Sequence, residues 1–188
     1  KELCSCSAGI ESICKTKACS QPSSGRRVYA SQFGLRTERQ NRIELLRKYL
    51  DRYPDTPYAN RILCAVSSCY FYEGKYDEAL ALFNSADLDL LGNEERDDCT
   101  YQLATCYLKT DNLREAAIWF ETLRANSPKY AKDCDYYLSY IRYTQKRYSE
   151  ALKGFLPLQD DSKYKALVPY YIAEILYAAQ KTMIRHKL

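Results

Sequence analysis

The sequence CYLKTDNLREAAIWF occupies residues 106–120 and sets the pattern for most of the chain. Its Leu113, Ala116 and Phe120 recur at the three- and four-residue spacing of one face of an α-helix. A small alanine lets a neighbouring helix approach closely. The phenylalanine four residues later lies on the same face and fills the space beside it. The pattern therefore predicts an amphipathic helix that buries its alanine–phenylalanine face against a second helix.

Further copies of this pattern lie on both sides of it. Residues 69–83 read CYFYEGKYDEALALF, 37 positions earlier, and residues 141–155 read IRYTQKRYSEALKGF, 35 positions later. A fourth, partial copy follows, in which residues 170–173 match residues 136–139 after a shift of 34. A repeat of this length is typical of helical hairpins that cannot bury their apolar faces alone and stack on their neighbours.

Prolines separate the copies. The residue before a proline disfavours the helical conformation, so Pro54, Pro57 and Pro128 predict interruptions between helices. We expect an irregular, cysteine-rich segment over residues 1–28, where no clear periodicity is visible, and a repeat array over residues 29–188. The array divides into a partial repeat (29–57), three full repeats (58–94, 95–129 and 130–163) and a second partial repeat (164–188).

The copies resemble the tetratricopeptide repeat family. The matching signature is Ala-x3-Phe with a proline downstream and an aromatic residue in the preceding helix. In the copy that fits best, these residues are Tyr107, Ala116, Phe120 and Pro128. The third copy departs from the signature, with Arg142 where the aromatic residue is expected. The resemblance covers about residues 36–180 and implies an all-α fold, a right-handed α–α superhelix (solenoid) of antiparallel helix pairs.

The resemblance also implies a non-enzymatic scaffold for protein–protein interactions. Aligning the copies assigns one set of aromatic residues to the concave side that the first helices of such arrays form. The set comprises Phe71, Tyr101, Tyr136, Tyr140, Tyr143, Tyr170 and Tyr177. Tyrosine offers a large contact area at low entropic cost and a hydroxyl for hydrogen bonds, so this set is the candidate site for a peptide or partner protein. Alternatively, the same rings fill space between helices.

The composition argues against an enzyme. The chain of 188 residues contains 19 Tyr but one His, His186, which disfavours catalytic triads, histidine-based zinc sites and most acid–base mechanisms. The net charge of +4 is too small to indicate nucleic acid. No apolar run approaches the ~20 residues that span a bilayer. We therefore expect no catalytic residues, no cofactor, no nucleic-acid partner and no integral membrane segment.

The cysteines form two groups. One group lies within the repeats and should be buried, because cysteine packs as a small apolar side chain. It comprises Cys64, Cys69, Cys99, Cys106 and Cys134. The other group lacks the paired spacing of zinc sites, and disulfides, a metal or no role remain open for it. It comprises Cys4, Cys6, Cys14 and Cys19. The acidic residues of 87–98 lack the spacing of a calcium loop, so no metal site is predicted.

The C-terminal end predicts a second kind of contact. The last helix carries apolar residues such as Ile172, Ile175 and Leu176, and no second helix follows to cover them. We therefore expect an exposed patch and homo-oligomerisation through residues 165–188. The corresponding alternative function is a structural or assembly subunit that self-associates through the open ends of its array.

Two features point to different compartments. Residues 53–59, YPDTPYA, are similar to the inter-repeat pattern of bacterial envelope members of the family, such as the lipoprotein of the β-barrel assembly machine and the Tol–Pal coordinator protein. This resemblance implies a periplasmic or envelope-associated protein. Nine cysteines fit a reducing compartment more easily, so a cytoplasmic location is the alternative.

Overall fold

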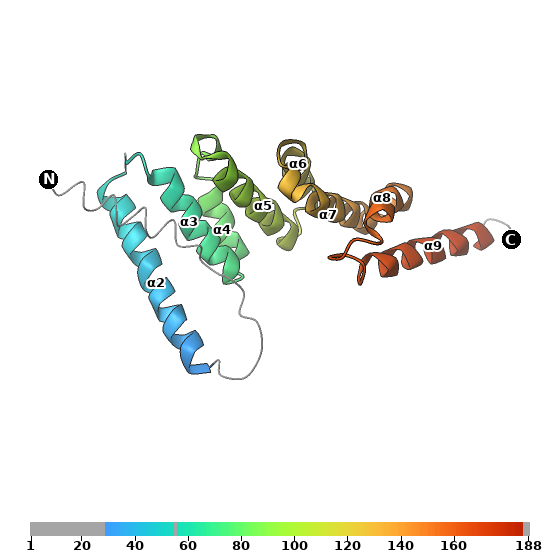
Figure 1. Ribbon diagram of the computed structural model, residues 1–188, viewed down its shortest axis with the longest axis horizontal. Coiled ribbons are helices and arrows are strands. Elements are labelled where there is room, and N and C mark those ends of the chain that lie inside the picture. Colours follow the sequence, from blue (N-terminus) through green and yellow to red (C-terminus); the bar gives the residue numbers. More distant parts are fainter. Residues whose placement is uncertain (1–28, 55, 186–188) are drawn as a thin grey trace. The chain divides into compact units, whose positions relative to one another are not determined.

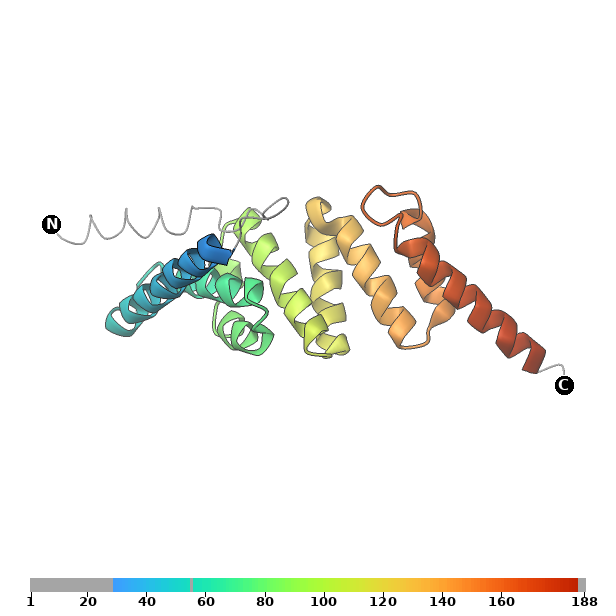
Figure 2. The ribbon, with the colours of Figure 1, turned by 90° about the horizontal axis from the view of Figure 1, so that it is seen from below.

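The structure, a computed structural model, describes residues 29–54 and 56–185. Within these ranges the chain forms α-helices, short 3-10 helices and turns, without a strand (Figures 1 and 2). The α-helices are α2 (Tyr29–Arg52), α3 (Ala59–Tyr72), α4 (Tyr76–Phe83), α5 (Asn93–Lys109), α6 (Leu113–Asn126), α7 (Ala131–Thr144), α8 (Tyr148–Phe155) and α9 (Val168–Arg185). The 3-10 helices are Leu88–Leu90, Pro128–Tyr130 and Leu156–Leu158. The predicted all-α fold of helix pairs is confirmed.

The chain divides between Cys99 and Thr100, within α5, into two compact units. In the N-terminal unit α3 packs against α2 and α4, and in the C-terminal unit α7 packs against α6 and α8, while α9 packs against α8. No helix in the described part of the chain is long and apolar enough to cross a bilayer. The predicted irregular segment 1–28, with its four cysteines, and His186 lie outside the described residues.

The turn inside each helix pair has one hydrogen-bond pattern. The backbone N–H of Lys75 donates to the carbonyl of Tyr70 at 3.0 Å, and bonds of 2.9 Å occupy the equivalent positions of the next two pairs. This six-to-one bond belongs to a Schellman motif, which ends a helix through a residue in the left-handed region. In the three successive helix pairs that residue is Gly74 (φ 77°), Asp111 (φ 63°) and Lys146 (φ 61°). The backbone of the turns therefore follows the same repeat as the sequence.

The alanine–phenylalanine face is buried in every helix pair. The alanines are Ala79, Ala116 and Ala151, and the phenylalanines are Phe83, Phe120 and Phe155, none of them more than 1% exposed. In the C-terminal unit the face contacts a neighbouring helix, because Ala116 and Phe120 of α6 share a core cluster with Leu138 of α7. This burial confirms the prediction made from residues 106–120.

The first helix of each pair carries a small, fully buried residue at one position, namely Ser67, Ala104 or Ser139. The Ser139 hydroxyl donates to the backbone carbonyl of Asp135 at 2.6 Å, so burial leaves it satisfied. A β-carbon added to Gly154 would lie 2.0 Å from Ser139 Oγ. The helices α7 and α8 therefore cross at a point where neither has room for a larger side chain.

A second core cluster of the C-terminal unit forms around Ala151 and Phe155 and includes Val168 and Ile175. The expectation that Ile175 is exposed is therefore wrong: its side chain is 2% exposed, because α9 turns this face toward the cluster around Phe155. Leu176 remains exposed, as expected.

Four cysteines of the repeats, Cys64, Cys99, Cys106 and Cys134, are buried as free thiols, which confirms the expectation for them, and Cys69 is half-buried. Burial raises the pKa of the Cys134 thiol to about 12. A hydrogen bond with Cys64, together with burial, raises the pKa of Cys99. Both thiols are thus protonated at neutral pH, the form that packs well in a core.

Ala116→Leu should destabilise the protein by about 1–3 kcal/mol, because extra carbon atoms overpack a buried close-contact position. The matched control is Ala125→Leu, since Ala125 is exposed in the same helix. The control should change the free energy of unfolding by less than about 0.5 kcal/mol. Urea denaturation followed by circular dichroism measures both values. Equal midpoints for the two variants would contradict the proposed packing of α6.

Candidate partner-binding face

Aromatic rings of the C-terminal unit form a compact group around Phe120. Phe120 stacks on Tyr137 with ring centroids 4.9 Å apart. Beside this pair, Tyr101 stacks on Tyr130 at 4.8 Å, and the hydroxyls of Tyr101 and Tyr137 are 3.4 Å apart. The group joins α5, α6, α7 and the short 3-10 helix that precedes α7.

The same arrangement recurs one repeat later. Phe155 stacks on Tyr171 with centroids 5.3 Å apart, and Tyr136 stacks on Tyr164 at 4.6 Å. Each of these four residues lies 34 or 35 positions after its equivalent in the first group. The repeats therefore preserve the geometry of the rings as well as the spacing of the sequence.

Four members of the predicted binding set take part in this packing. Tyr101 and Tyr136 belong to the stacked groups, and burial raises the pKa of both hydroxyls. Tyr140 and Tyr143 meet the ring of Tyr171 edge-on, at 5.9 and 5.3 Å. All four are half-buried. The rings of these four residues therefore take part in packing between helices.

The remaining members of the set differ in exposure. Phe71 belongs to the N-terminal unit, where it is half-buried and meets Tyr72 and Tyr76 edge-on at 5.3 and 6.0 Å. Tyr170 and Tyr177 of α9 are 62% and 70% exposed. The candidate surface is therefore the part of the C-terminal unit around these two tyrosines.

A carboxylate lies between the exposed tyrosines and the packed ones. The hydroxyl of Tyr143, on α7, donates to Glu174 Oε2 at 2.5 Å, and the hydroxyl of Tyr170 donates to Glu174 Oε1 at 3.0 Å. Tyr170, Glu174 and Tyr177 follow one another at helical spacing along one side of α9. We refer to Tyr143, Tyr170, Glu174 and Tyr177 as the Glu174 site.

The charge of Glu174 controls the ionisation of its neighbours. The hydrogen bond to this carboxylate raises the pKa of Tyr143 to about 12, and it also raises the pKa of Tyr170. Both hydroxyls therefore keep their protons at neutral pH and act as donors. Among the described residues, no lysine or arginine forms an ion pair with Glu174.

Sequence reasoning did not identify Glu174. Its spacing from Tyr170 and Tyr177 was visible in the sequence, since the three residues share one side of a predicted helix. The hydrogen bond from Tyr143 was not visible, because the two residues are 31 positions apart and meet through the packing of α7 and α9.

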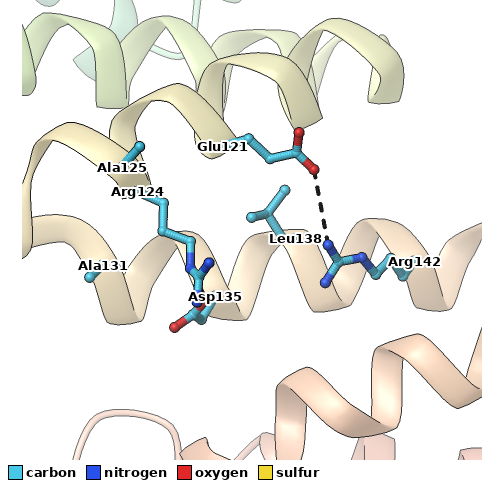
Figure 3. A pocket seen from close by; sticks show the side chains of 7 residues that line it. All are labelled: Glu121, Arg124, Ala125, Ala131, Asp135, Leu138 and Arg142. Carbon is cyan, nitrogen blue, oxygen red and sulfur yellow. Dashed lines mark ion pairs between the residues drawn. The ribbon is translucent and has the colours of Figure 1, made fainter.

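A groove of about 350 Å³ lies between α6 and α7 (Figure 3). Figure 3 shows Arg124 and Asp135 pointing toward each other, with Arg124 Nε 2.5 Å from Asp135 Oδ1. It also shows Glu121 facing Arg142, at 4.0 Å between charged atoms. Arg142 and Tyr143 are consecutive and point roughly 100° apart on the helix. The groove therefore lies on a different face of α7 from the Glu174 site.

The charges of this groove balance internally. An adjoining cavity of about 420 Å³ extends it to α8 and adds Glu150, Lys153 and Gly154 to its lining. Together, three acidic and three basic side chains line the two cavities. Because the opposite charges lie beside one another, the groove does not favour a ligand of either sign. Within residues 29–54 and 56–185, no group of histidine, cysteine or acidic residues is arranged to hold a metal ion.

Comparison with known proteins gives one match. Residues 70–135 match a family model described as tetratricopeptide repeat. The matched segment contains α4, α5 and α6 in full. No curated protein matches the chain.

Glu174→Gln should lower the pKa of Tyr143 from about 12 toward the ordinary tyrosine value of about 10, because the variant removes the negative charge that opposes ionisation. The pKa of Tyr164, raised mainly by burial, should not change. Carbon-13 NMR of the tyrosine Cζ atoms across a pH series measures both.

The same hydrogen bond links stability to pH. The pKa of Tyr143 is higher in the folded chain than in an unfolded one. The bond therefore contributes fully to the free energy of unfolding below about pH 10, and this contribution is lost as the pH rises toward about 12.

In the NMR titration, an unchanged pKa of Tyr143 in Glu174→Gln would show that the hydrogen bond to Glu174 is not formed.

Proposed function

Because residues 70–135 match the tetratricopeptide repeat family, we propose that the chain is a non-enzymatic scaffold that binds a peptide or partner protein on the tyrosine-rich face of its C-terminal unit. Repeats of this family generally mediate protein–protein interactions. The observation that carries the proposal is the exposure of Tyr170 and Tyr177, at 62% and 70%. Large aromatic side chains supply much of the energy of protein interfaces, so neighbouring exposed tyrosines favour an interaction surface.

The packed rings of the core hold the exposed Tyr170 in place. Tyr171 meets the ring of Tyr170 edge-on at 6.0 Å and is itself stacked on Phe155. The hydrogen bond to Glu174 further restricts Tyr170. Side chains that are already ordered lose less conformational entropy on binding, so such a face binds better than a mobile one.

Combined replacement of Tyr170 and Tyr177 by alanine should weaken partner binding about tenfold or more, because each substitution removes an aromatic contact. The matched control replaces Tyr53 and Tyr72, which are 44% and 48% exposed in the N-terminal unit. Proteins captured by the full chain from its native cells are identified by mass spectrometry, and their affinity for each variant is then measured. Equal capture by both double variants would contradict the assignment of this face.

A specific observation favours self-association as a second candidate function. Leu176 lies on α9, next to Tyr177 in the sequence, and is 55% exposed. Leu167, the residue directly before α9, is 52% exposed. Exposed large apolar side chains on the last helix and directly before it favour an interface with another copy. Sedimentation velocity should then show a concentration-dependent dimer that Leu176→Glu abolishes. A monomer at all concentrations would exclude this candidate.

The proposed scaffold has no catalytic step, no cofactor and no nucleic-acid partner. The periplasmic or envelope-associated location that residues 53–59 suggest stays a prediction, as does the cytoplasmic alternative.

A further inference from the structure

We propose that the Glu174 site receives the positively charged side chain of a lysine or arginine from the partner, an inference that rests on the scaffold function proposed above. The site places one carboxylate in hydrogen-bond contact with Tyr143 and Tyr170, and the exposed Tyr177 follows Glu174 by three residues on the same side of α9. A carboxylate attracts a cation by charge and hydrogen bonding, and the face of an aromatic ring attracts it through the ring quadrupole.

The carboxylate of Glu174 is able to accept more bonds than it has. Each of its oxygens accepts one hydrogen bond from a tyrosine hydroxyl, at 2.5 and 3.0 Å. An ionised carboxylate offers about four acceptor positions, so roughly two remain. The side chain is half-buried and forms no ion pair within the described part of the chain. It has therefore lost part of its hydration without gaining a counter-charge, and an added cation is favoured.

The same unit contains an occupied example of this arrangement. Lys163 Nζ lies 2.6 Å from Asp133 Oδ1 and 5.4 Å from the centre of the Tyr164 ring. The hydroxyl of Tyr164 donates to the same Asp133 oxygen. A tyrosine–carboxylate pair here holds a lysine, and the Glu174 site has the same pair with a second tyrosine donor but without the lysine.

The N-terminal unit contains a related example. Lys75 Nζ lies 2.9 Å from Glu73 Oε2 and 5.5 Å from the centre of the Tyr70 ring. In both units, therefore, this chain places a lysine where a carboxylate and a tyrosine face are close together. These two examples indicate that a carboxylate beside a tyrosine, as in the Glu174 site, suits a basic side chain as its ligand.

Other ligand classes fit this site less well. A partner carboxylate would meet the like charge of Glu174, and the described residues of the site include no lysine or arginine to offset the repulsion. A purely apolar segment would remove more water from the carboxylate without replacing its hydrogen bonds, at a cost in free energy. A basic side chain avoids both costs, and its methylene stem packs on the rings of Tyr170 and Tyr177.

The test is an NMR titration of the full chain, labelled with carbon-13 at the tyrosine Cζ atoms. The probes are acetylated and amidated glycine tripeptides with a central lysine, arginine, norleucine or glutamate. The lysine and arginine peptides should shift the signals of Tyr143 and Tyr170 in a saturable way, and the other two should not. Glu174→Gln should weaken binding of the basic peptides by up to about fivefold, because it removes the charge that pairs with the cation. The matched control, Glu121→Gln, changes an exposed carboxylate of α6 and should leave the affinity unchanged.

The inference is overturned if the basic peptides give no saturable shift, if norleucine binds as well as lysine, or if Glu174→Gln binds like the unaltered chain. The comparison of lysine with norleucine uses the unaltered protein and does not depend on the stability of any variant. Partner capture separates this inference from the scaffold function. If replacing Tyr170 and Tyr177 abolishes capture while Glu174→Gln does not, the face binds its partner without a cation, and this inference alone fails. If neither variant affects capture, both proposals fail.

Discussion

The stacking of a buried phenylalanine on a tyrosine of the following helix fixes the C-terminal unit. Phe120 contacts Tyr137 and Phe155 contacts Tyr171 in this way, one repeat apart. The stack forms because a fully buried alanine four residues before each phenylalanine lets the helices approach closely. Each stack sets both the distance and the rotation of the next helix, since an aromatic face contacts its partner in few orientations.

This constraint also positions the candidate binding face. Tyr171 points into the core, so its neighbour Tyr170, rotated by roughly 100° on the helix, points outward. Glu174 lies one turn further along α9, where it meets the hydroxyl of Tyr143 from α7. The carboxylate and its two tyrosine donors therefore owe their geometry to a core contact of Phe155 rather than to a loop, and side chains held in this way are already ordered before any partner binds.

Local periodicity explains which features the sequence predicted. The spacing of Ala116 and Phe120 and the prolines between copies act over a few residues, so the helix pairs and their buried faces followed from them. Tyr130 and Tyr164, which complete the stacked groups, lie in segments between helix pairs where no helical spacing marks them. Ile175 was assigned to the wrong side of α9 because the apolar residues of this helix cover more than one face. Glu174 depends on a contact between two helices, which no local pattern encodes.

The occupied example at Asp133 indicates what a cation contributes at such a site. The side chain of Lys163 is 59% exposed even in contact with Asp133, which is 15% exposed. Ion pairs with one such solvated partner contribute about 0–1 kcal/mol, and a cation over an exposed ring about 0.5–1 kcal/mol. The rings of Tyr170 and Tyr177 offer a larger contact area, so in the proposed interface we expect them to supply most of the affinity. In that interface we expect the carboxylate of Glu174 to act chiefly on specificity, because a partner without a basic residue would leave a half-buried charge unpaired and would lose the free energy of the ion pair.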